Sequence, residues 1–332
     1  MNNRNLLGTW IRRFLLEYMV TERNLSHNTQ VSYRDTLVQL LPFASELVQQ
    51  PIDKMKVDDL SPSVIKLFLL NIEDNRNCSI ATRNLRLSAI HSLARFIGRY
   101  SPEHIEWCSN VRSIPIKKKV ISQVGYLEKP EMDALLVAPD RKTTLGERDY
   151  ILLLFLYNSG ARADEVARLT VDCLNLNEPA YVRVYGKGNK IRICPLWKQT
   201  ALLLRSLISG CGVTDHVFRS RINKPMTRFG IHRIVTQYAR IASESISTIK
   251  DKRVSPHLIR HTTAVHLLRA GVDINTIRAW LGHVSLDTTN IYAEVDIEMK
   301  AKALACVDIP ESISTMSYKE NRPSLMMFLK KL

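Results

Sequence analysis

Apolar residues recur at helical spacing throughout the first part of the chain. Residues 7–21 and 29–47 each predict a helix with one apolar face, separated by a polar break at residues 24–29 that is rich in capping side chains. Ser61 followed by Pro62 predicts the start of a third helix, because proline is tolerated in the first helical turn. Ser79 predicts the start of a fourth, whose expected apolar face comprises Leu85, Ala89, Ile90, Leu93 and Phe96.

The pattern becomes mixed from about residue 126. Pro130 predicts the start of a helix, and the apolar stretch 145–157 predicts a long buried one. Residues 181–185 and 191–194 alternate as strands do, and the Gly/Asn-rich turn between them indicates a β-hairpin. Helices dominate again from 195 to 305. The expected fold class is mainly α with a small β-sheet, a helical N-terminal domain preceding a mixed α/β domain.

A change of composition marks a linker between these parts. Around Val111 to Gly125 the chain contains Pro115 and the run Lys117, Lys118 and Lys119. A basic linker of this kind could follow a phosphate backbone, although a charge run is also common in a merely solvated segment. The predicted division is 1–112 for the helical domain, 113–125 for the linker, 126–306 for the second domain and 307–332 for a C-terminal tail.

Charge and composition narrow the function classes. The formal net charge is +15 over 332 residues and the pI is about 9.6, which favours a polyanionic partner such as nucleic acid, the alternative being a basic, solvated surface. No apolar stretch approaches the roughly 18 residues of a membrane helix, and the N-terminus lacks a secretory pattern. None of the six cysteines has metal-ligand spacing. A cytoplasmic, nucleoid-associated protein with reduced thiols, no membrane association and no metal or cofactor is expected.

One polar cluster lies on a predicted helix that begins at Ser255 and Pro256. His257, Arg260 and His261 fall at positions i, i+3 and i+4, so they share one helical face. Imidazoles and a guanidinium on one face favour an oxyanion site, because arginine offers a planar fork of donors suited to phosphate. A half-exposed basic face is the structural alternative.

Three further elements carry candidate chemistry. Arg162 stands at a predicted helix start, where its charge opposes the helix dipole and calls for an anion such as Glu165. Lys187 lies at the hairpin tip. Gly282 can end a helix in the left-handed conformation and direct His283 into a cleft, and Tyr292 follows nine residues later. Taken singly, these residues also suit ordinary loop, turn and core positions.

Together, and in this order, the motifs resemble the tyrosine recombinase or phage-type integrase family, in particular its Xer-like two-domain members. The resemblance extends over about 130 residues and departs little from the family pattern: Ala161 replaces a larger apolar residue, and Asp164 precedes the acidic position. The motifs are Gly-Ala-Arg162-x-x-Glu165, Gly-Lys187-Gly-Asn-Lys, His257-x-x-Arg260-His261, Leu-Gly-His283 and Tyr292.

The resemblance implies an N-terminal core-binding domain of the SAM-like type and a catalytic domain that cuts and rejoins DNA. Tyr292 would attack the phosphodiester and form a 3′-phosphotyrosyl link, so that neither ATP nor a metal is required. Arg162 and Arg260 would clamp the phosphate, Lys187 would protonate the departing 5′ oxygen, and His257 would act as acid and base. The remaining implied roles are a hydrogen bond from His283 to the phosphate and supporting contacts from Glu165 and His261.

The resemblance also bears on partners. Double-stranded DNA would carry a tetramer of the protein, with a second recombinase or an accessory protein as a further partner. The basic linker between two domains predicts that the protein holds this DNA as a clamp, one domain on each side. The apolar cluster Leu325, Met327 and Phe328 in the tail would pack on a neighbouring protomer, or else on its own domain.

Two other functions fit part of the sequence. A type IB topoisomerase shares the chemistry, and a helix-turn-helix regulator would account for residues 261–281, but it would leave Arg162, Lys187 and Tyr292 unexplained. A mobile element and chromosome-dimer resolution are both compatible biological settings.

Overall fold

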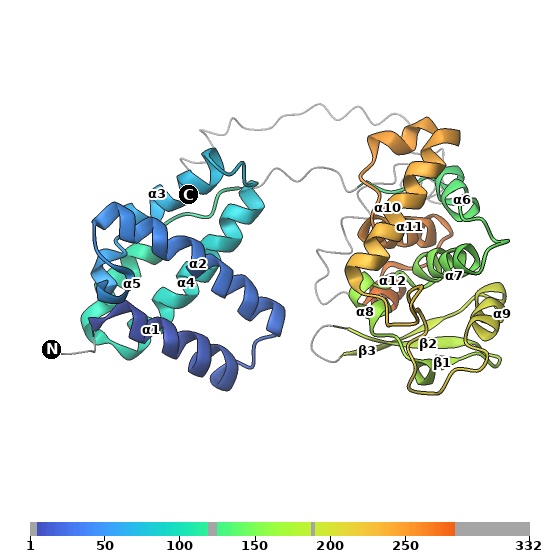
Figure 1. The fold of residues 1–332 in the computed structure, drawn as a ribbon, viewed down its shortest axis with the longest axis horizontal. Coiled ribbons are helices and arrows are strands. Elements are labelled where there is room, and N and C mark those ends of the chain that lie inside the picture. Colours follow the sequence, from blue (N-terminus) through green and yellow to red (C-terminus); the bar gives the residue numbers. More distant parts are fainter. Residues whose placement is uncertain (1–4, 119–124, 187–189, 283–332) are drawn as a thin grey trace, which may run out of the picture. The chain divides into compact units, whose positions relative to one another are not determined.

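The chain divides into two compact units, residues 1–122 and 123–332, in a computed structural model that describes residues 5–118, 125–186 and 190–282 (Figure 1). Both units are mainly helical, and the second adds a small sheet. The predicted fold class, mainly α with a small β-sheet, is confirmed. Within the described ranges, no helix is long and apolar enough to cross a membrane.

The predicted N-terminal helices are confirmed. The first continues beyond α1 as a π-helical segment, in which the Arg23 N–H bonds to the Tyr18 carbonyl five residues earlier (2.9 Å). The helices of this unit are α1 (Leu7–Arg13), the π-helix η2 (Phe14–Glu22), α2 (His27–Val48), α3 (Pro62–Asp74), α4 (Ile80–Tyr100) and α5 (Ile105–Arg112), with short 3₁₀ turns at Ile52–Lys54, Val57–Asp59 and Pro102–His104.

Serine side chains set two of the helix starts, as predicted. The Ser61 hydroxyl accepts a hydrogen bond from the Val64 N–H at the start of α3, and Ser79 accepts one from Thr82 at the start of α4, both at 3.3 Å. These contacts satisfy amides that have no partner within the helix. Each capping serine therefore lies where the sequence predicts the helix to begin.

Two features of this unit differ from expectation. Leu85 is 50% exposed rather than part of the core, because it stands two positions from both Arg83 and Leu87, which are buried on the opposite side of α4. Helix α5 is not predicted from the sequence, because a helix of eight residues is too short to show a clear repeat of apolar positions. It buries Trp107, Cys108 and Val111, so Val111 belongs to a helix and not to an extended segment.

The first residues of the predicted linker are fixed against the N-terminal unit. Ile114 is buried, and the Pro115 carbonyl accepts a hydrogen bond from Arg83 Nη1 (2.9 Å). Asn84 Nδ2 donates to the Lys117 carbonyl (2.8 Å), and the Lys117 backbone N–H donates to Asn84 Oδ1 (3.1 Å). This part of the chain therefore follows α4 instead of leaving the unit directly at residue 113.

The second unit combines helices with a three-stranded antiparallel sheet of order β1-β2-β3. The predicted hairpin is confirmed: β2 pairs with β3 from Tyr181–Pro195 to Tyr185–Ile191. The elements are α6 (Lys129–Val137), α7 (Thr144–Ser159), α8 (Ala163–Ala167), the 3₁₀ turn η6 (Val171–Cys173), β1 (Leu174–Asn175), β2 (Tyr181–Tyr185), β3 (Ile191–Pro195), α9 (Lys198–Leu207), α10 (Arg228–Ser245), the 3₁₀ turn η8 (Ser247–Asp251), α11 (Pro256–Arg269) and α12 (Ile274–Leu281).

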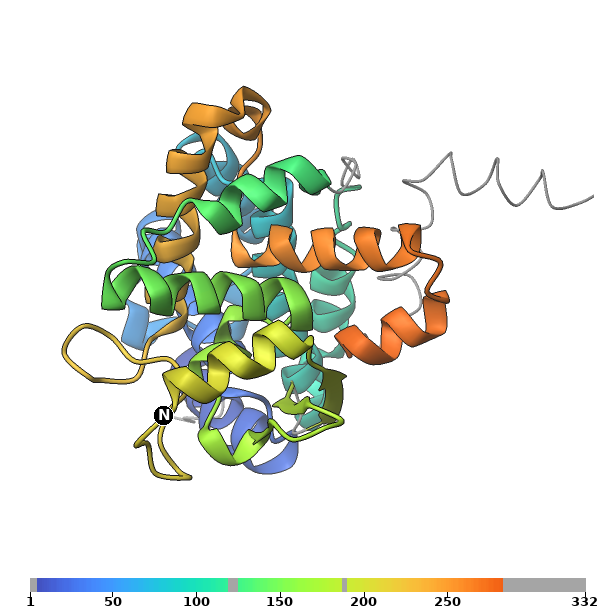
Figure 2. The ribbon, with the colours of Figure 1, turned by 90° about the vertical axis from the view of Figure 1, so that its right-hand side faces the viewer.

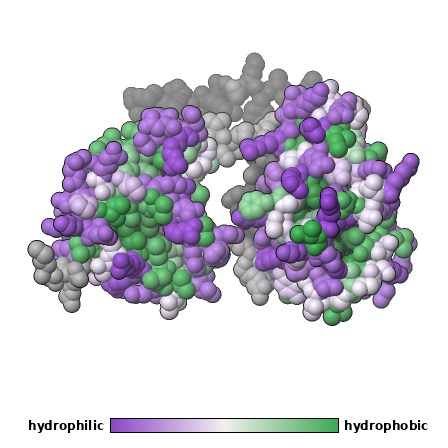
Figure 3. All heavy atoms as spheres, viewed as in Figure 1, coloured by the Kyte–Doolittle hydropathy of each residue, from purple (hydrophilic) through white to green (hydrophobic). Residues whose placement is uncertain are grey.

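Helix α7 is the centre of this unit. Residues 149–159 are all buried, as the apolar run predicts. Helix α11 runs alongside it, as Figure 2 shows with α7 in green and α11 in orange. The Thr263 hydroxyl donates to the Tyr157 carbonyl (2.7 Å). The pairing places the N-terminal part of α11 beside the C-terminal end of α7. Polar side chains cover much of the visible face of each unit (Figure 3).

Candidate active site

Arg162 occupies the N-cap position of α8, with its guanidinium directed partly to solvent. Its backbone N–H donates to Glu165 Oε2 and its Nη1 donates to Glu165 Oε1, both at 2.8 Å. The Arg162 side chain remains 41% exposed, whereas that of Glu165 is 2% exposed. The anion that a basic residue at a helix start requires is therefore Glu165, and part of the guanidinium is still available to a ligand.

Glu165 has a second cationic partner, Arg192 on β3. Arg192 Nη1 and Nη2 donate to Glu165 Oε1 and Oε2 at 3.0 and 2.6 Å, and the pair is buried. Burial alone would raise the pKa of Glu165, but the hydrogen bonds and charges of Arg192 and Arg162 outweigh it and lower the pKa to about 2. Glu165 is therefore ionised at any physiological pH.

Arg260 is almost completely enclosed, with 1% of its surface exposed. Its Nη1 donates to the Gly160 carbonyl (2.8 Å) and its Nη2 to the Leu281 carbonyl (2.6 Å). These carbonyls lie at the C-terminal ends of α7 and α12, where the helix dipoles concentrate negative potential. The predicted clustering with His257 and His261 is present, but the Arg260 guanidinium is a buried junction of two helix ends and not a half-exposed surface group.

His257 and His261 pack against each other, with ring centroids 4.3 Å apart. Part of the His257 ring is exposed, but partial burial lowers its pKa, and the positive charges of Arg260 and Arg162 lower it further. Burial, with His257 and Arg260, lowers the pKa of His261 to about 4. Both imidazoles are thus neutral at pH 7, so each has a nitrogen able to accept a proton.

Two glycines allow these segments to meet. Gly160 ends α7 with φ of +58°, and a Cβ there would lie 2.4 Å from Leu281 Cδ2. Gly282 ends α12 with φ of +67°, as predicted, and a Cβ there would lie 3.0 Å from Arg192 Cδ. Close approach therefore brings Arg260 into contact with Gly160, 100 residues away in sequence and two residues before Arg162.

Several predicted site residues lie outside the described residues: Lys119, Lys187, His283 and Tyr292, together with the tail cluster Leu325, Met327 and Phe328. Of the predicted basic linker residues, Lys118 is exposed, and the Lys117 ammonium pairs with Glu73 on α3 (2.8 Å). Lys117 is therefore partly neutralised by a neighbouring carboxylate.

Sequence reasoning missed two features. Arg192 follows the hairpin motif by only a few residues, and its inward position on a strand that alternates exposed and buried residues is the signal that could have identified it. The second is a basic face on α10, where Arg228, His232, Arg233 and Arg240 are exposed at helical spacing together with Phe229.

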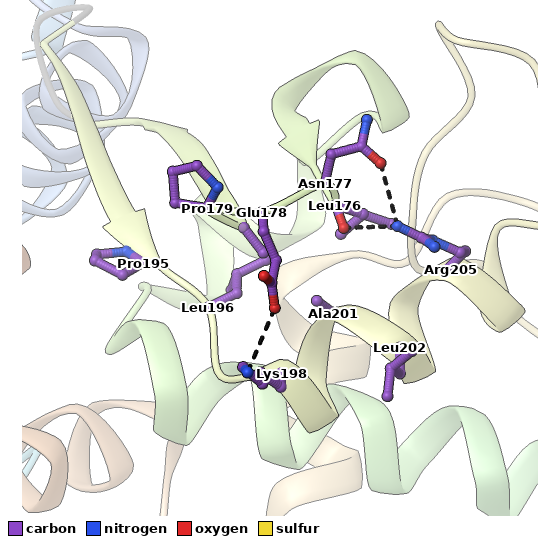
Figure 4. Close-up of a pocket in the computed structure, with 11 residues that line it drawn as sticks. Leu176, Asn177, Glu178, Pro179, Pro195, Leu196, Lys198, Ala201, Leu202 and Arg205 are labelled. Atoms are coloured by element: carbon purple, nitrogen blue, oxygen red, sulfur yellow. Dashed lines mark hydrogen bonds and ion pairs between the residues drawn. The ribbon is translucent and has the colours of Figure 1, made fainter.

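A pocket of about 850 Å³ lies elsewhere in the second unit (Figure 4). It is bordered by the loop at Leu176–Pro179 and by α9, where Lys198 pairs with Glu178 and Arg205 donates to the Leu176 carbonyl. None of its lining residues belongs to the arginine and histidine cluster. The candidate active site is thus a surface of converging side chains rather than this pocket.

The lowered histidine pKa values predict a pH dependence of stability. His257, His261 and His266 bind protons less readily in the folded chain than at the ordinary value of 6.5. The unfolded chain therefore binds more protons below about pH 6.5, so stability is lost as pH falls from there towards 4. Thermal unfolding between pH 7 and 5 should show this loss, and His261→Gln should reduce it by about 2–4 °C. If the unfolding temperature of His261→Gln fell with pH as steeply as that of the wild type, the lowered pKa of His261 would be contradicted. Between pH 7 and 8, where these histidines are already neutral, the two proteins should show the same pH dependence.

Comparison with known proteins identifies the family. Residues 125–299 match the phage integrase family, and residues 11–99 match the phage integrase N-terminal SAM-like domain. The y4rC protein of Sinorhizobium fredii, whose name assigns it to the integrases and recombinases, is 38% identical over 90% of this chain and 91% of its own length. The tyrosine recombinase XerD of Vibrio cholerae is 31% identical, covering 85% of this chain and 91% of its own.

Solved structures share the fold. An integrase of the transposon Tn1549, in complex with transposon right-end DNA, aligns with a TM-score of 0.68 and 16% identity, over 91% of this chain and 99% of that one. The XerH recombinase bound to its DNA substrate aligns with a TM-score of 0.66 and 19% identity, over 85% and 81% of the two chains. The sequence motifs, the family match and the relatives agree: the chain belongs to the phage integrase family and is a tyrosine recombinase, an enzyme of site-specific DNA recombination.

Proposed function

We propose that Tyr292 is the nucleophile of this recombinase and that Arg162, Lys187, His257, Arg260 and His283 complete its active site, with Glu165 and His261 in support. The observation that carries this proposal is the convergence of Arg162 with the face of α11 that bears His257, Arg260 and His261. A phosphodiester is an anion, and its transition state carries still more negative charge, which two guanidinium groups stabilise.

The geometry suggests a division of labour between the arginines. Arg162 has an exposed guanidinium edge and can contact a non-bridging phosphate oxygen directly. Arg260 directs two donors to helix-end carbonyls, and it keeps its positive charge beneath the site. His257, neutral before DNA binds, can take the proton of the attacking Tyr292 hydroxyl, whose ordinary pKa of about 10 keeps it protonated at pH 7.

We further propose that the duplex contacts the exposed basic face of α10 and the linker residues Lys118 and Lys119. Positive side chains at helical spacing suit a phosphate backbone, and Phe229 adds an exposed apolar ring among them. Lys117 contributes less, because Glu73 already pairs with its ammonium. The two units would hold the duplex between them as a clamp.

Covalent capture tests the function. Nicked duplexes tiled across the DNA that flanks the gene are incubated with the full-length protein, denatured and resolved on a gel. The expected result is a protein–DNA adduct at one inverted-repeat site, with the nucleotide attached to the peptide that contains Tyr292. Attachment to a different residue would overturn the assignment of the nucleophile.

We propose a mobile element, rather than chromosome-dimer resolution, as the biological setting. Identity to the y4rC integrase/recombinase, 38%, exceeds identity to the XerD recombinase, 31%. We propose a second recombinase as a partner, because Sinorhizobium fredii carries both y4rC and y4rD, the latter 33% identical over 79% of this chain. Capture of the site beside the gene, and not at a chromosomal locus far from it, would support the mobile element.

Assembly into a tetramer on DNA is the remaining proposal, with the tail cluster Leu325, Met327 and Phe328 packing on a neighbouring protomer. Deleting residues from Pro323 onward should leave binding to a half-site unchanged, but it should lower the yield of paired complexes and of recombinants. Gel-shift titration on one and two half-sites measures both effects. Unchanged recombination would exclude the packing in trans, and lost half-site binding would favour packing within one protomer.

A further inference from the structure

Arg192 carries a buried charge at the centre of the site, although it belongs to none of the motifs that indicate catalysis. It lies on β3 with 8% of its side chain exposed. Its guanidinium faces Glu165 with two parallel hydrogen bonds, at 3.0 and 2.6 Å. Because both Nη atoms of Arg192 donate to Glu165, Arg192 influences the other site residues by fixing the position of this carboxylate.

The carboxylate of Glu165 is shared equally between Arg192 and Arg162. Oε1 accepts from Nη1 of both arginines, and Oε2 accepts from Arg192 Nη2 and from the Arg162 backbone N–H. Arg192 thereby supplies half of the hydrogen bonds and one of the two cations that balance this buried anion. Without Arg192, Glu165 would rely on Arg162 alone, which would draw the Arg162 guanidinium inward, away from a phosphate.

The same ion pair lies directly beneath two glycines that precede proposed catalytic residues. A Cβ on Gly282 would lie 3.0 Å from Arg192 Cδ, and the next residue in sequence is His283. A Cβ on Gly186 would lie 3.5 Å from Glu165 Oε1 and 3.7 Å from Arg192 Nη1, and the next residue is Lys187. The chain segments that lead to both residues are therefore packed against the Glu165–Arg192 pair.

We propose that Arg192 is a positioning residue for strand cleavage: through Glu165 it keeps the Arg162 guanidinium directed outward, and its side chain supports the Gly186 and Gly282 segments. This inference rests on the proposed roles of Arg162, Lys187 and His283. Arg192 touches no reacting atom in this arrangement. Its contribution is to fix the relative position of three elements, the start of α8, the β2–β3 hairpin and the end of α12.

The test is single-turnover cleavage by the full-length protein on a nicked duplex that carries the site recovered by covalent capture. The variants are Arg192→Gln and Arg192→Lys, with Arg183→Gln as the matched control. Arg183 lies on β2 of the same hairpin, but it is exposed and donates to the Asp172 carbonyl (2.6 Å), outside the Glu165 network. Rate constant and amplitude are recorded separately, because loss of folded enzyme lowers the amplitude, whereas misplacement of catalytic groups lowers the rate constant.

Arg192→Gln should lower the cleavage rate constant about 100-fold, the effect of a misplacement of roughly 1 Å, with half-site binding within about threefold of wild type. Arg192→Lys should recover only part of this loss, because an ammonium keeps the charge but not the two-donor fork. It also serves as the informative variant if Arg192→Gln fails to fold. Arg183→Gln should cleave at the wild-type rate.

A double variant tests whether Arg192 acts through Glu165. Glu165→Gln with Arg192→Gln should cleave no more slowly than the more impaired single variant, since both changes disrupt one pair. Additive losses, or a wild-type rate constant with only reduced amplitude, would overturn the inference. The wild-type protein and Tyr292→Phe are run in parallel: if the adduct forms and depends on Tyr292, the proposed function stands even where the Arg192 prediction fails.

Discussion

Tyr292→Phe is expected to abolish the covalent protein–DNA adduct while leaving DNA binding within about twofold of wild type. Phenylalanine retains the ring and removes only the hydroxyl, so packing and charge are preserved and the attacking atom is lost. The expected effect is total for the chemical step, because phenylalanine offers no oxygen to form the phosphotyrosyl bond.

The measurement is trapping on a nicked suicide duplex, analysed on a denaturing gel beside a gel shift on the intact site. Tyr181→Phe is the matched control, since Tyr181 lies at the end of β2 remote from Gly186, where it pairs with Pro195. An adduct that persists in Tyr292→Phe would exclude Tyr292 as the nucleophile. Loss of DNA binding together with the adduct would point to a structural role for the hydroxyl.

Arg162→Lys and Arg260→Lys are both expected to lower cleavage by about two to three orders of magnitude, equivalent to about 3–4 kcal/mol of transition-state stabilisation. Lysine keeps the positive charge, but it presents a single point of contact instead of a planar fork. Arg162 would lose its fork on the phosphate, and Arg260 would lose the two carbonyl contacts that fix its charge beneath the site. The structure predicts that the two variants differ in stability. Arg162 is partly exposed, and Glu165 retains Arg192 when Arg162 is changed.

Arg260→Lys should destabilise the catalytic unit as well. The Arg260 guanidinium joins the C-terminal ends of α7 and α12, and each carbonyl left without its donor costs about 1–3 kcal/mol. Thermal unfolding should therefore shift for Arg260→Lys and hardly change for Arg162→Lys. Arg168→Lys is the control, because Arg168 lies just after α8 in an exposed pair with Asp164. Near wild-type cleavage by Arg162→Lys would refute its contact with the phosphate, and near wild-type cleavage by Arg260→Lys would refute the role of its buried charge.

Local sequence signals were sufficient for several helix starts and for the hairpin. Ser61, Ser79 and Ser255 each provide a side-chain cap for the amides of the helix that follows, and these contacts form between residues three apart. The hairpin is equally local, because alternation and a glycine-rich turn specify both strands and their register. Helix α5 was not predicted, because its eight residues are too few to show a helical repeat of apolar positions. Leu85 was wrongly assigned to the core, because α4 buries the face that contains Arg83 and Leu87.

The sequence by itself determined the residue types of the site and their order along the chain, which is enough to indicate the family and the chemistry. Only the tertiary structure decided how those residues share charge. Glu165 on α8 pairs with Arg192 on β3, and the Arg260 guanidinium donates to carbonyls that lie 100 and 21 residues away in sequence. A sequence pattern shows the spacing of side chains within one element, whereas burial and ion pairing depend on which elements pack together. Here the packing of α7, α11, α12 and β3 determines both the burial of Arg260 and the ion pairing of Glu165.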